Sequence, residues 1–133
     1  IRVIYSRPAK KDRDVFGKLI PYGKVWRLGA NEATEIKLYQ DVMIQGKALK
    51  AGTYAFFAIP NETEWTLIFN TDLDHWGAYS YDAAKDVLRV NVPTKKAEEV
   101  IENFSMQIIK SNDKEALLRM GWDNTVAELP ISI

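Results

Sequence analysis

Hydrophobic and polar residues alternate with a period of two along much of the chain, which predicts strands with one buried and one solvent-facing side. In the clearest case, Ile36 and Leu38 fall on one face and the charged residues Glu35 and Lys37 fall on the other. Residues 53–59 are apolar on both faces and predict a central strand. Further strands are expected at residues 3–6, 24–28, 42–45, 65–69, 88–92, 104–108, 116–122 and 126–133.

Breaks in this pattern predict turns and little helix. Pro60 and Pro93 are expected to end the strands before them, because proline cannot donate a ladder hydrogen bond. Ser80 is a candidate cap for one helical turn over residues 82–85, and the apolar spacing in residues 94–103 permits a second short helix. Many short strands with frequent turns predict an all-β fold. We expect one domain, residues 1–133, built as an antiparallel β-sandwich of the jelly-roll type with at most one or two short helical turns.

Length and composition agree with that expectation and exclude several partners. The chain has 133 residues, 47% of them hydrophobic, which is enough for one buried core. It carries 18 basic and 18 acidic residues, so strong electrostatic affinity for nucleic acid or anionic membranes is not indicated. No apolar run approaches the ~20 residues of a membrane span. The chain begins at Ile1 rather than Met, which we interpret as a processed or trimmed form.

The familiar catalytic and metal-binding motifs are missing from the sequence. It has no cysteine, and His75 is its only histidine, so we expect no thiolate or histidine-rich metal site. Residues 70–74 begin like a calcium loop, but His75 and Tyr81 stand where that loop needs Gly and Glu. No serine stands in a Gly-x-Ser-x-Gly elbow. We therefore expect no cofactor and nominate no catalytic residue.

Residues 21–34 form the most distinctive stretch. If residues 24–28 are a strand, Trp26 and Arg27 point to opposite faces, and one of them faces the core. An inward Arg27 would need Glu32, Glu35 or several carbonyls as partners, because an unpaired buried charge is very costly. The stretch after Leu28 is expected to turn with a glycine or asparagine in the left-handed conformation.

Two interpretations of this stretch stay open. In the first, Arg27, Asn31 and Glu32 form a polar cluster beside aromatic walls from Tyr22 and Trp26, which suits an anionic or sugar-like ligand. In the second, a salt bridge and an asparagine turn form a corner that holds two sheets together. We favour the structural interpretation, because ion-pair networks that hold a fold together also resemble sites.

Other candidates lie outside this stretch. Trp76 and Tyr81 belong to an aromatic loop that either stacks on a sugar or peptide or packs back onto the sheet edge. Arg7, which leaves the first strand, and Arg89 are further candidate ligand-binding residues. The basic run at residues 10–13 includes an acid and is interpreted as a solvated loop.

A series of short motifs connects these candidates. They are Tyr5-Ser6-Arg7-Pro8, Phe16-Gly17, Pro21-Tyr22-Gly23, Trp26-Arg27, Gly29-Ala30-Asn31-Glu32-Ala33-Thr34, Ala51-Gly52-Thr53-Tyr54, Ile59-Pro60, Trp65, Trp76-Gly77-Ala78-Tyr79 and Asp86-Val87-Leu88-Arg89-Val90. At these residues the chain resembles the DUF2911 family, a bacterial family of unknown function common in Bacteroidetes. Leu28 departs from the family pattern, which usually has Thr there, and Asp12 stands where Gly is usual.

The resemblance implies an exported protein of the periplasm or cell envelope and implies no enzyme activity. Together with the candidate residues, it leads us to expect a non-catalytic envelope domain that binds a carbohydrate or a small anionic ligand. One alternative is a hydrolase that uses Asp or Glu as acid and base. The other is a structural or protein-interaction module.

Overall fold

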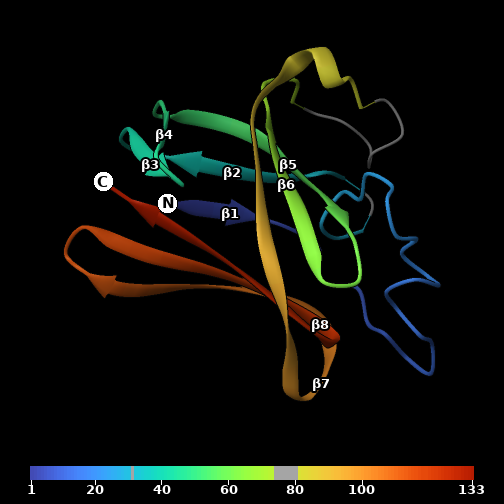
Figure 1. The fold of residues 1–133 in the computed structure, drawn as a ribbon. Coiled ribbons are helices and arrows are strands. Elements are labelled where there is room, and N and C mark those ends of the chain that lie inside the picture. The colour runs from blue at the N-terminus through green and yellow to red at the C-terminus, as the bar shows by residue number, and fades with distance from the viewer. Residues whose placement is uncertain (31, 74–80) are drawn as a thin grey trace.

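A computed structural model of the chain describes residues 1–30, 32–73 and 81–133 (Figure 1). The described part is built from antiparallel strands, and its only helix is a single 3-10 turn, which confirms the predicted all-β class. The elements are β1 (Arg2–Ile4), β2 (Thr34–Leu38), β3 (Val42–Ile44), β4 (Lys47–Leu49), β5 (Gly52–Pro60), β6 (Glu64–Asn70), the turn η1 (Ala83–Lys85), β7 (Asp86–Asn112) and β8 (Glu115–Ser132).

Hydrogen bonds join the strands into one open sheet in the order β1-β2-β5-β6-β7-β8-β3-β4. The long strand β7 belongs to both parts of this sheet, since its first residues pair with β6 and residues from Thr94 onward pair with β8. In Figure 1, β7 crosses the molecule and returns as β8 in a long hairpin. The hydrogen bonding is therefore continuous, and the predicted division into the two sheets of a sandwich is not confirmed.

The short helix that the apolar spacing of residues 94–103 permitted does not form, because these residues belong to β7. Pro93 does not end that strand; it pairs with Glu64 where β7 changes partner from β6 to β8. The register against β8 shifts on both sides of Ile101. Such irregularities offset the period-two pattern, so the apolar residues acquire a spacing that resembles a helix.

The structure also differs from the sequence-based predictions at two strands and at one helix cap. Residues 24–28 form no strand; instead Trp26 makes one isolated bridge to Ala58. The unpredicted strand β4 follows β3 through Gln45 and Gly46, which have φ angles of 50° and 77° and make the tight turn of a two-residue hairpin. The cap of η1 is Asp82, whose carboxylate accepts a hydrogen bond from the backbone N–H of Ala84, and Ser80 lies outside the described residues.

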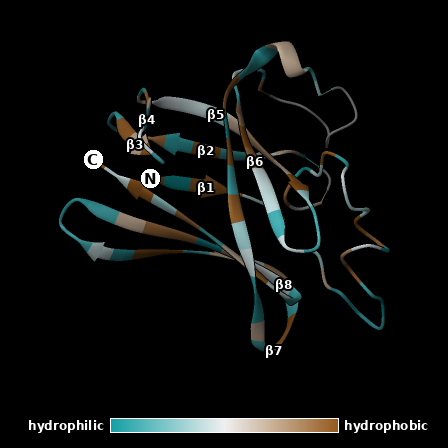
Figure 2. Cartoon of the chain, in the orientation of Figure 1, coloured by the Kyte–Doolittle hydropathy of each residue, from teal (hydrophilic) through white to brown (hydrophobic). Residues whose placement is uncertain are grey.

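The inner face of the sheet encloses the main core, in which strands β2 to β8 all take part. Hydrophobic and hydrophilic segments alternate along the strands in Figure 2, as the period-two pattern requires. On the other face, Phe57 and Ile68 form a smaller cluster with Ala55, against which Val25 and Tyr81 pack. Strand β5 supplies side chains to both clusters, which explains why it is apolar on both faces.

Candidate functional site

A pocket of about 350 Å³ lies beside the distinctive stretch at residues 21–30. Three of its described lining side chains are cationic, namely Arg13, Lys24 and Arg27, and none is acidic. The indole groups of Trp26 and Trp122 form its aromatic part. Most of the remaining lining is apolar and comprises Pro8, Leu19, Ile20, Pro21 and Val25.

The edge of β5 positions the stretch that carries Arg27. The backbone N–H of Trp26 donates to the carbonyl of Ala58 at 2.7 Å, and the N–H of Ala58 donates back at 2.9 Å. The N–H of Gly23 donates to the carbonyl of Pro60 at 2.8 Å. This pairing places the Trp26 ring in the core and leaves the next residue, Arg27, half-buried at the pocket.

The backbone turns sharply just after Arg27. Leu28 has a φ of 53° and takes the left-handed conformation that was expected at a glycine or asparagine, while its own side chain is fully buried in the core. Its carbonyl accepts a hydrogen bond of 2.6 Å from the hydroxyl of Thr34. A Cβ at Gly29 would lie 3.0 Å from the carbonyl oxygen of Ser6, so this turn packs closely against the N-terminal segment.

Arg27 is the most informative residue of the pocket. In the part of the chain that the structure describes, it forms no ion pair with Glu35 or with Glu32, which is exposed. Its Nε atom is buried and has no hydrogen-bond partner there. A buried guanidinium nitrogen without a partner is costly, and the charge of Arg27 lies at a pocket whose described lining holds no acidic side chain.

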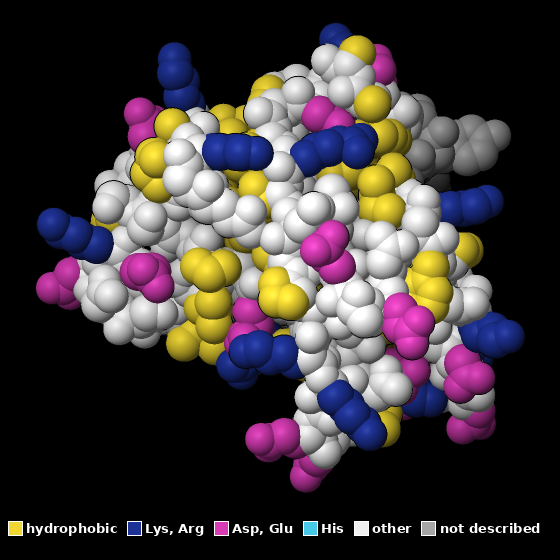
Figure 3. Space-filling model, in the orientation of Figure 1, with side chains coloured by type: hydrophobic (Ala, Val, Ile, Leu, Met, Phe, Trp, Pro, Cys, Tyr) yellow, Lys and Arg dark blue, Asp and Glu magenta, His cyan; other side chains and the backbone are white. Residues whose placement is uncertain are grey.

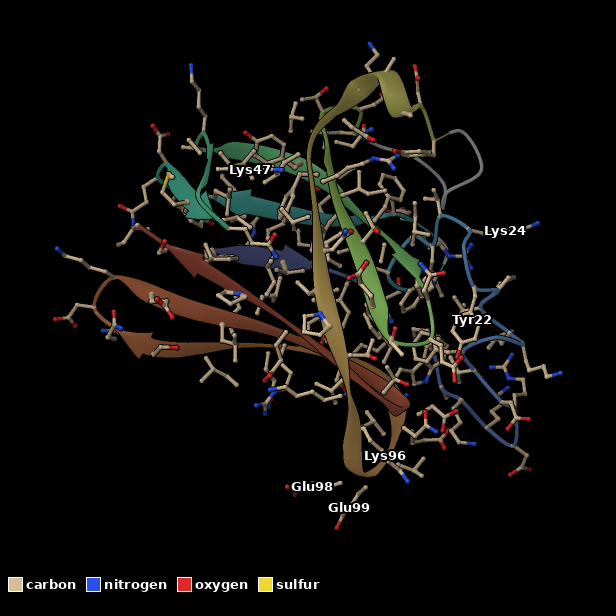
Figure 4. The ribbon with its side chains drawn as sticks, in the orientation of Figure 1. Tyr22, Lys24, Lys47, Lys96, Glu98 and Glu99 are labelled. Carbon is tan, nitrogen blue, oxygen red and sulfur yellow. The ribbon has the colours of Figure 1, made fainter. Side chains whose placement is uncertain are left out.

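The guanidinium of Arg13 is held in place by its own loop. Its Nε donates to the carbonyl of Lys10 at 3.0 Å and one Nη donates to the carbonyl of Ala9 at 2.7 Å. The loop in turn is tied to β7, because the N–H of Lys10 donates to the carbonyl of Glu102 at 2.7 Å. Lys24, by contrast, extends from the rim of the pocket into solvent (Figure 4).

The two tryptophans that line the pocket are almost completely buried. Their rings stack at a centroid distance of 6.0 Å and an angle of 20°, and they are only 5% and 1% exposed. The indole N–H of Trp26 donates to the carbonyl of Gly29 at 3.3 Å, and that of Trp122 donates to the carbonyl of Glu102 at 3.0 Å. A sugar ring therefore finds no accessible aromatic face on Trp26.

The other candidates from residues 1–34 lie elsewhere. Arg7 donates from Nε to the carbonyl of Phe104 at 3.2 Å and from an Nη to the hydroxyl of Ser105 at 3.0 Å, so it joins the N-terminal segment to β7. Tyr22 is exposed and packs against Gly17, where a Cβ would lie 2.8 Å from its ring. Neither residue lines the pocket. Asn31 and Trp76 lie outside the described residues.

Tyr81 and Arg89 meet in a separate polar network around Asp86. The Tyr81 hydroxyl donates to Asp86 at 2.5 Å, and Nε of Arg89 donates to the same carboxylate oxygen at 2.7 Å. The other oxygen of Asp86 accepts a 2.9 Å hydrogen bond from the buried side chain of Asn70. Burial and the bond to Asp86 raise the pKa of Tyr81 above its ordinary value. The network joins the end of β6 to the start of β7 and is not part of the pocket.

Several pocket residues were not nominated from the sequence, among them Arg13, Lys24, Leu19 and Trp122. Arg13 belongs to the basic run that we interpreted as a solvated loop; that loop is bonded to β7, and Arg13 lines the same pocket as Arg27. Trp122 was assigned simply to a strand. Its alternation with Met120 and Leu118 indicated burial, but no local signal indicated which residues it would meet.

A second pocket, of about 490 Å³, is formed by β7 and β8 and is lined by side chains of both signs, including Lys95, Arg119 and Glu128. Among the described residues, no group of three or more His, Asp or Glu side chains is placed to hold a metal ion. No helix in the same part of the chain is long and apolar enough to cross a membrane. On the face shown in Figure 3, basic and acidic side chains are interspersed rather than gathered by sign.

Comparison with known proteins gives one finding. The model of a family described as "protein of unknown function (DUF2911)" matches residues 1–131. No curated protein and no solved structure matches the chain.

Proposed function

The chain belongs to the DUF2911 family, and since that membership assigns no activity, we propose from the pocket that the protein binds a small anionic ligand beside Arg27 without transforming it. The observation that carries this proposal is the buried Nε of Arg27, which has no partner among the described residues. A guanidinium offers a planar fork of donors that matches a carboxylate or phosphate.

The electrostatics of the pocket support the same proposal. Arg13 and Lys24 add positive charge, and no described lining side chain carries a negative one. The ordered position of Arg13 reduces the entropy that ligand binding would cost. A volume of about 350 Å³ falls at the small end of the range for small-molecule sites.

Two alternatives receive less support from the geometry. A carbohydrate site usually offers an open aromatic face and several polar partners for hydroxyl groups. Here Trp26 and Trp122 are stacked on each other and buried. A hydrolase of the acid–base type needs two carboxylates at the reacting bond, whereas the described lining of this pocket contributes none.

The proposal is tested by thermal-shift and calorimetric titrations with inorganic phosphate, sulfate, small carboxylates and neutral sugars. We expect at least one anion class to raise the melting temperature of the wild type, since a ligand that binds only the folded state stabilises it. Arg27→Gln should weaken that binding about tenfold or more, and Arg27→Lys should give an intermediate loss because lysine lacks the planar fork.

A charge-matched control separates a site from a general field effect. Lys47→Gln also removes one positive charge, from the exposed start of β4, on a different side of the molecule from Lys24 (Figure 4). This variant should bind anions like the wild type. If Arg27→Gln binds every tested anion as tightly as Lys47→Gln does, the proposed site is wrong.

We also propose, from the family resemblance, that the protein acts in the bacterial cell envelope. Fractionation of cells that express the full-length protein should then recover it in the periplasmic or membrane fraction. Recovery in the cytosolic fraction alone would contradict this location.

A further inference from the structure

We propose that the pocket is specific for amphipathic organic acids, in which one anionic head is joined to an apolar body such as a ring or a short alkyl chain. This inference rests on the proposed function and narrows it. It follows from the way the lining divides into a cationic part and an apolar part.

The cationic part accounts for the anionic head. Arg27, whose buried Nε has no partner among the described residues, and the loop-bound Arg13 both line the pocket. A carboxylate that accepts from the guanidinium of Arg27 would pair with its positive charge and keep its own second oxygen available for further bonds. The head group is therefore expected at Arg27.

The apolar part needs a different ligand group. Leu19, Ile20 and Pro21 are consecutive residues of the lining; Leu19 is 39% exposed, and Ile20 packs against the main core. Their side chains cannot form hydrogen bonds with hydroxyl groups or with a second anionic group. An apolar ligand body would remove these surfaces from water, which is favourable in proportion to the area buried.

The size of the pocket argues against a bare inorganic ion as its full occupant. About 350 Å³ is far more than one tetrahedral oxyanion fills, and the rest would remain as water against apolar walls. A highly polar ligand such as a sugar phosphate would place hydroxyl groups against the same walls without partners, at a cost in free energy. The lining thus favours a monoanion with an apolar body.

The inference is tested with four probes in NMR or calorimetric titrations: phenylacetate, acetate, phenylethanol and inorganic phosphate. Phenylacetate should bind about tenfold tighter than acetate, because its ring adds buried apolar area. It should also bind about tenfold tighter than phenylethanol, which has the ring but cannot pair with Arg27.

Variants then assign the two parts of the ligand to the two parts of the pocket. Arg27→Gln should weaken phenylacetate and acetate alike. Leu19→Ser should weaken phenylacetate by about fivefold and leave acetate unchanged, since only the ring would meet that wall. Met43→Ser is the matched control, because Met43 is 41% exposed on β3 and does not line the pocket; it should change neither affinity.

The outcomes distinguish this inference from the function on which it rests. If acetate or phosphate binds as tightly as phenylacetate and Arg27→Gln abolishes that binding, anion binding stands and the amphipathic specificity is overturned. If phenylethanol binds as tightly as phenylacetate, the charge of the head group is not used and the amphipathic specificity is overturned, while anion binding is judged by the Arg27 dependence of acetate and phosphate. Absence of Arg27-dependent binding for every anion overturns both as well.

Discussion

The indole rings of Trp26 and Trp122 stack 6.0 Å apart, although one lies before β2 and the other in the last strand. Trp26 also contacts Phe16, Trp65 and Phe104, so it lies at the centre of an aromatic group. The same two tryptophans line the candidate pocket. Core stability and the pocket are therefore coupled through this pair.

Trp26→Ala should destabilise the protein by about 3–5 kcal/mol, the range for truncation of a large aromatic side chain in a core. Trp26→Phe should cost less, because it keeps an aromatic ring in contact with Trp122. Urea unfolding followed by far-UV circular dichroism measures both. Equal midpoints for the alanine variant and the wild type would show that the ring is not buried as described.

Thr34→Val should lower the free energy of unfolding by about 1–3 kcal/mol. The substitution keeps the shape of a fully buried residue but removes the hydroxyl that donates to the Leu28 carbonyl at 2.6 Å. Thr34→Ser is the control, since it retains the donor and loses only a methyl group. The prediction fails in urea unfolding if the serine variant is the less stable of the two.

Gly29→Ala should be more destabilising than Gly46→Ala. Gly46 has a φ of 77° and open space where a Cβ would lie, so alanine there carries only the left-handed backbone cost of about 1–2 kcal/mol. At Gly29 the added Cβ would meet the carbonyl oxygen of Ser6 at 3.0 Å, and the N-terminal segment would have to move. Thermal and urea unfolding of the two variants give the comparison; the reverse order would contradict the close approach.

Glu128 should contribute stability that is lost in acid. Its hydrogen bond with Lys95 and then that with Arg119 hold the pKa of Glu128 below its ordinary value of 4.5. The folded state therefore binds this proton more weakly than the unfolded chain. The stabilising contribution of Glu128 is complete above the pKa that Glu128 has in the unfolded chain. It disappears as the pH falls through the pKa that Glu128 has in the folded protein.

The measurement is the urea midpoint as a function of pH for the wild type and for Glu128→Gln. The wild type should lose more of its free energy of unfolding on acidification than the variant does, and salt should reduce the difference because Lys95 is largely exposed. Parallel pH profiles for the two proteins would contradict the prediction.

Tyr81→Phe should lower the free energy of unfolding by about 1 kcal/mol, because it removes the hydroxyl that donates to Asp86 and accepts from Arg89.

A second prediction follows from the raised pKa of Tyr81. Stability that depends on the neutral phenol is present below the unfolded pKa and is lost as the pH rises through the folded pKa. Ultraviolet titration should lose one late-ionising tyrosine in the variant; an unchanged titration curve would contradict the assignment.

Much of the strand arrangement was predictable because strand patterning is local. Ile36 and Leu38 alternate with charged neighbours, and the structure buries both of them in β2. The course of β7 was not predictable in this way. Its change of partner at Pro93 and its irregular register around Ile101 depend on β6 and β8, which contribute nothing to a local pattern.

One part of the candidate site was predictable from the sequence. The stretch around Arg27 was singled out by its composition, and Trp26 and Arg27 do line one pocket. The proposed carboxylate partners and the aromatic wall from Tyr22 do not join them in the described residues. Arg13 and Trp122 reach the pocket through contacts between distant segments, and such contacts leave no trace in the spacing of residues along the chain.

The sharing of β7 between two sets of strands also bears on how the protein folds. Neither β6 nor β8 can keep its ladder with β7 if that strand detaches, so the sheet should unfold as one cooperative unit rather than in stages. The N-terminal segment also reaches β7 across most of the chain, through the hydrogen bonds of Pro8 and Lys10 with Phe104 and Glu102. A topology with such non-local contacts folds slowly for its size. In the newly made chain, the second half of β7 must therefore wait for β8, the last strand, before its ladder can form.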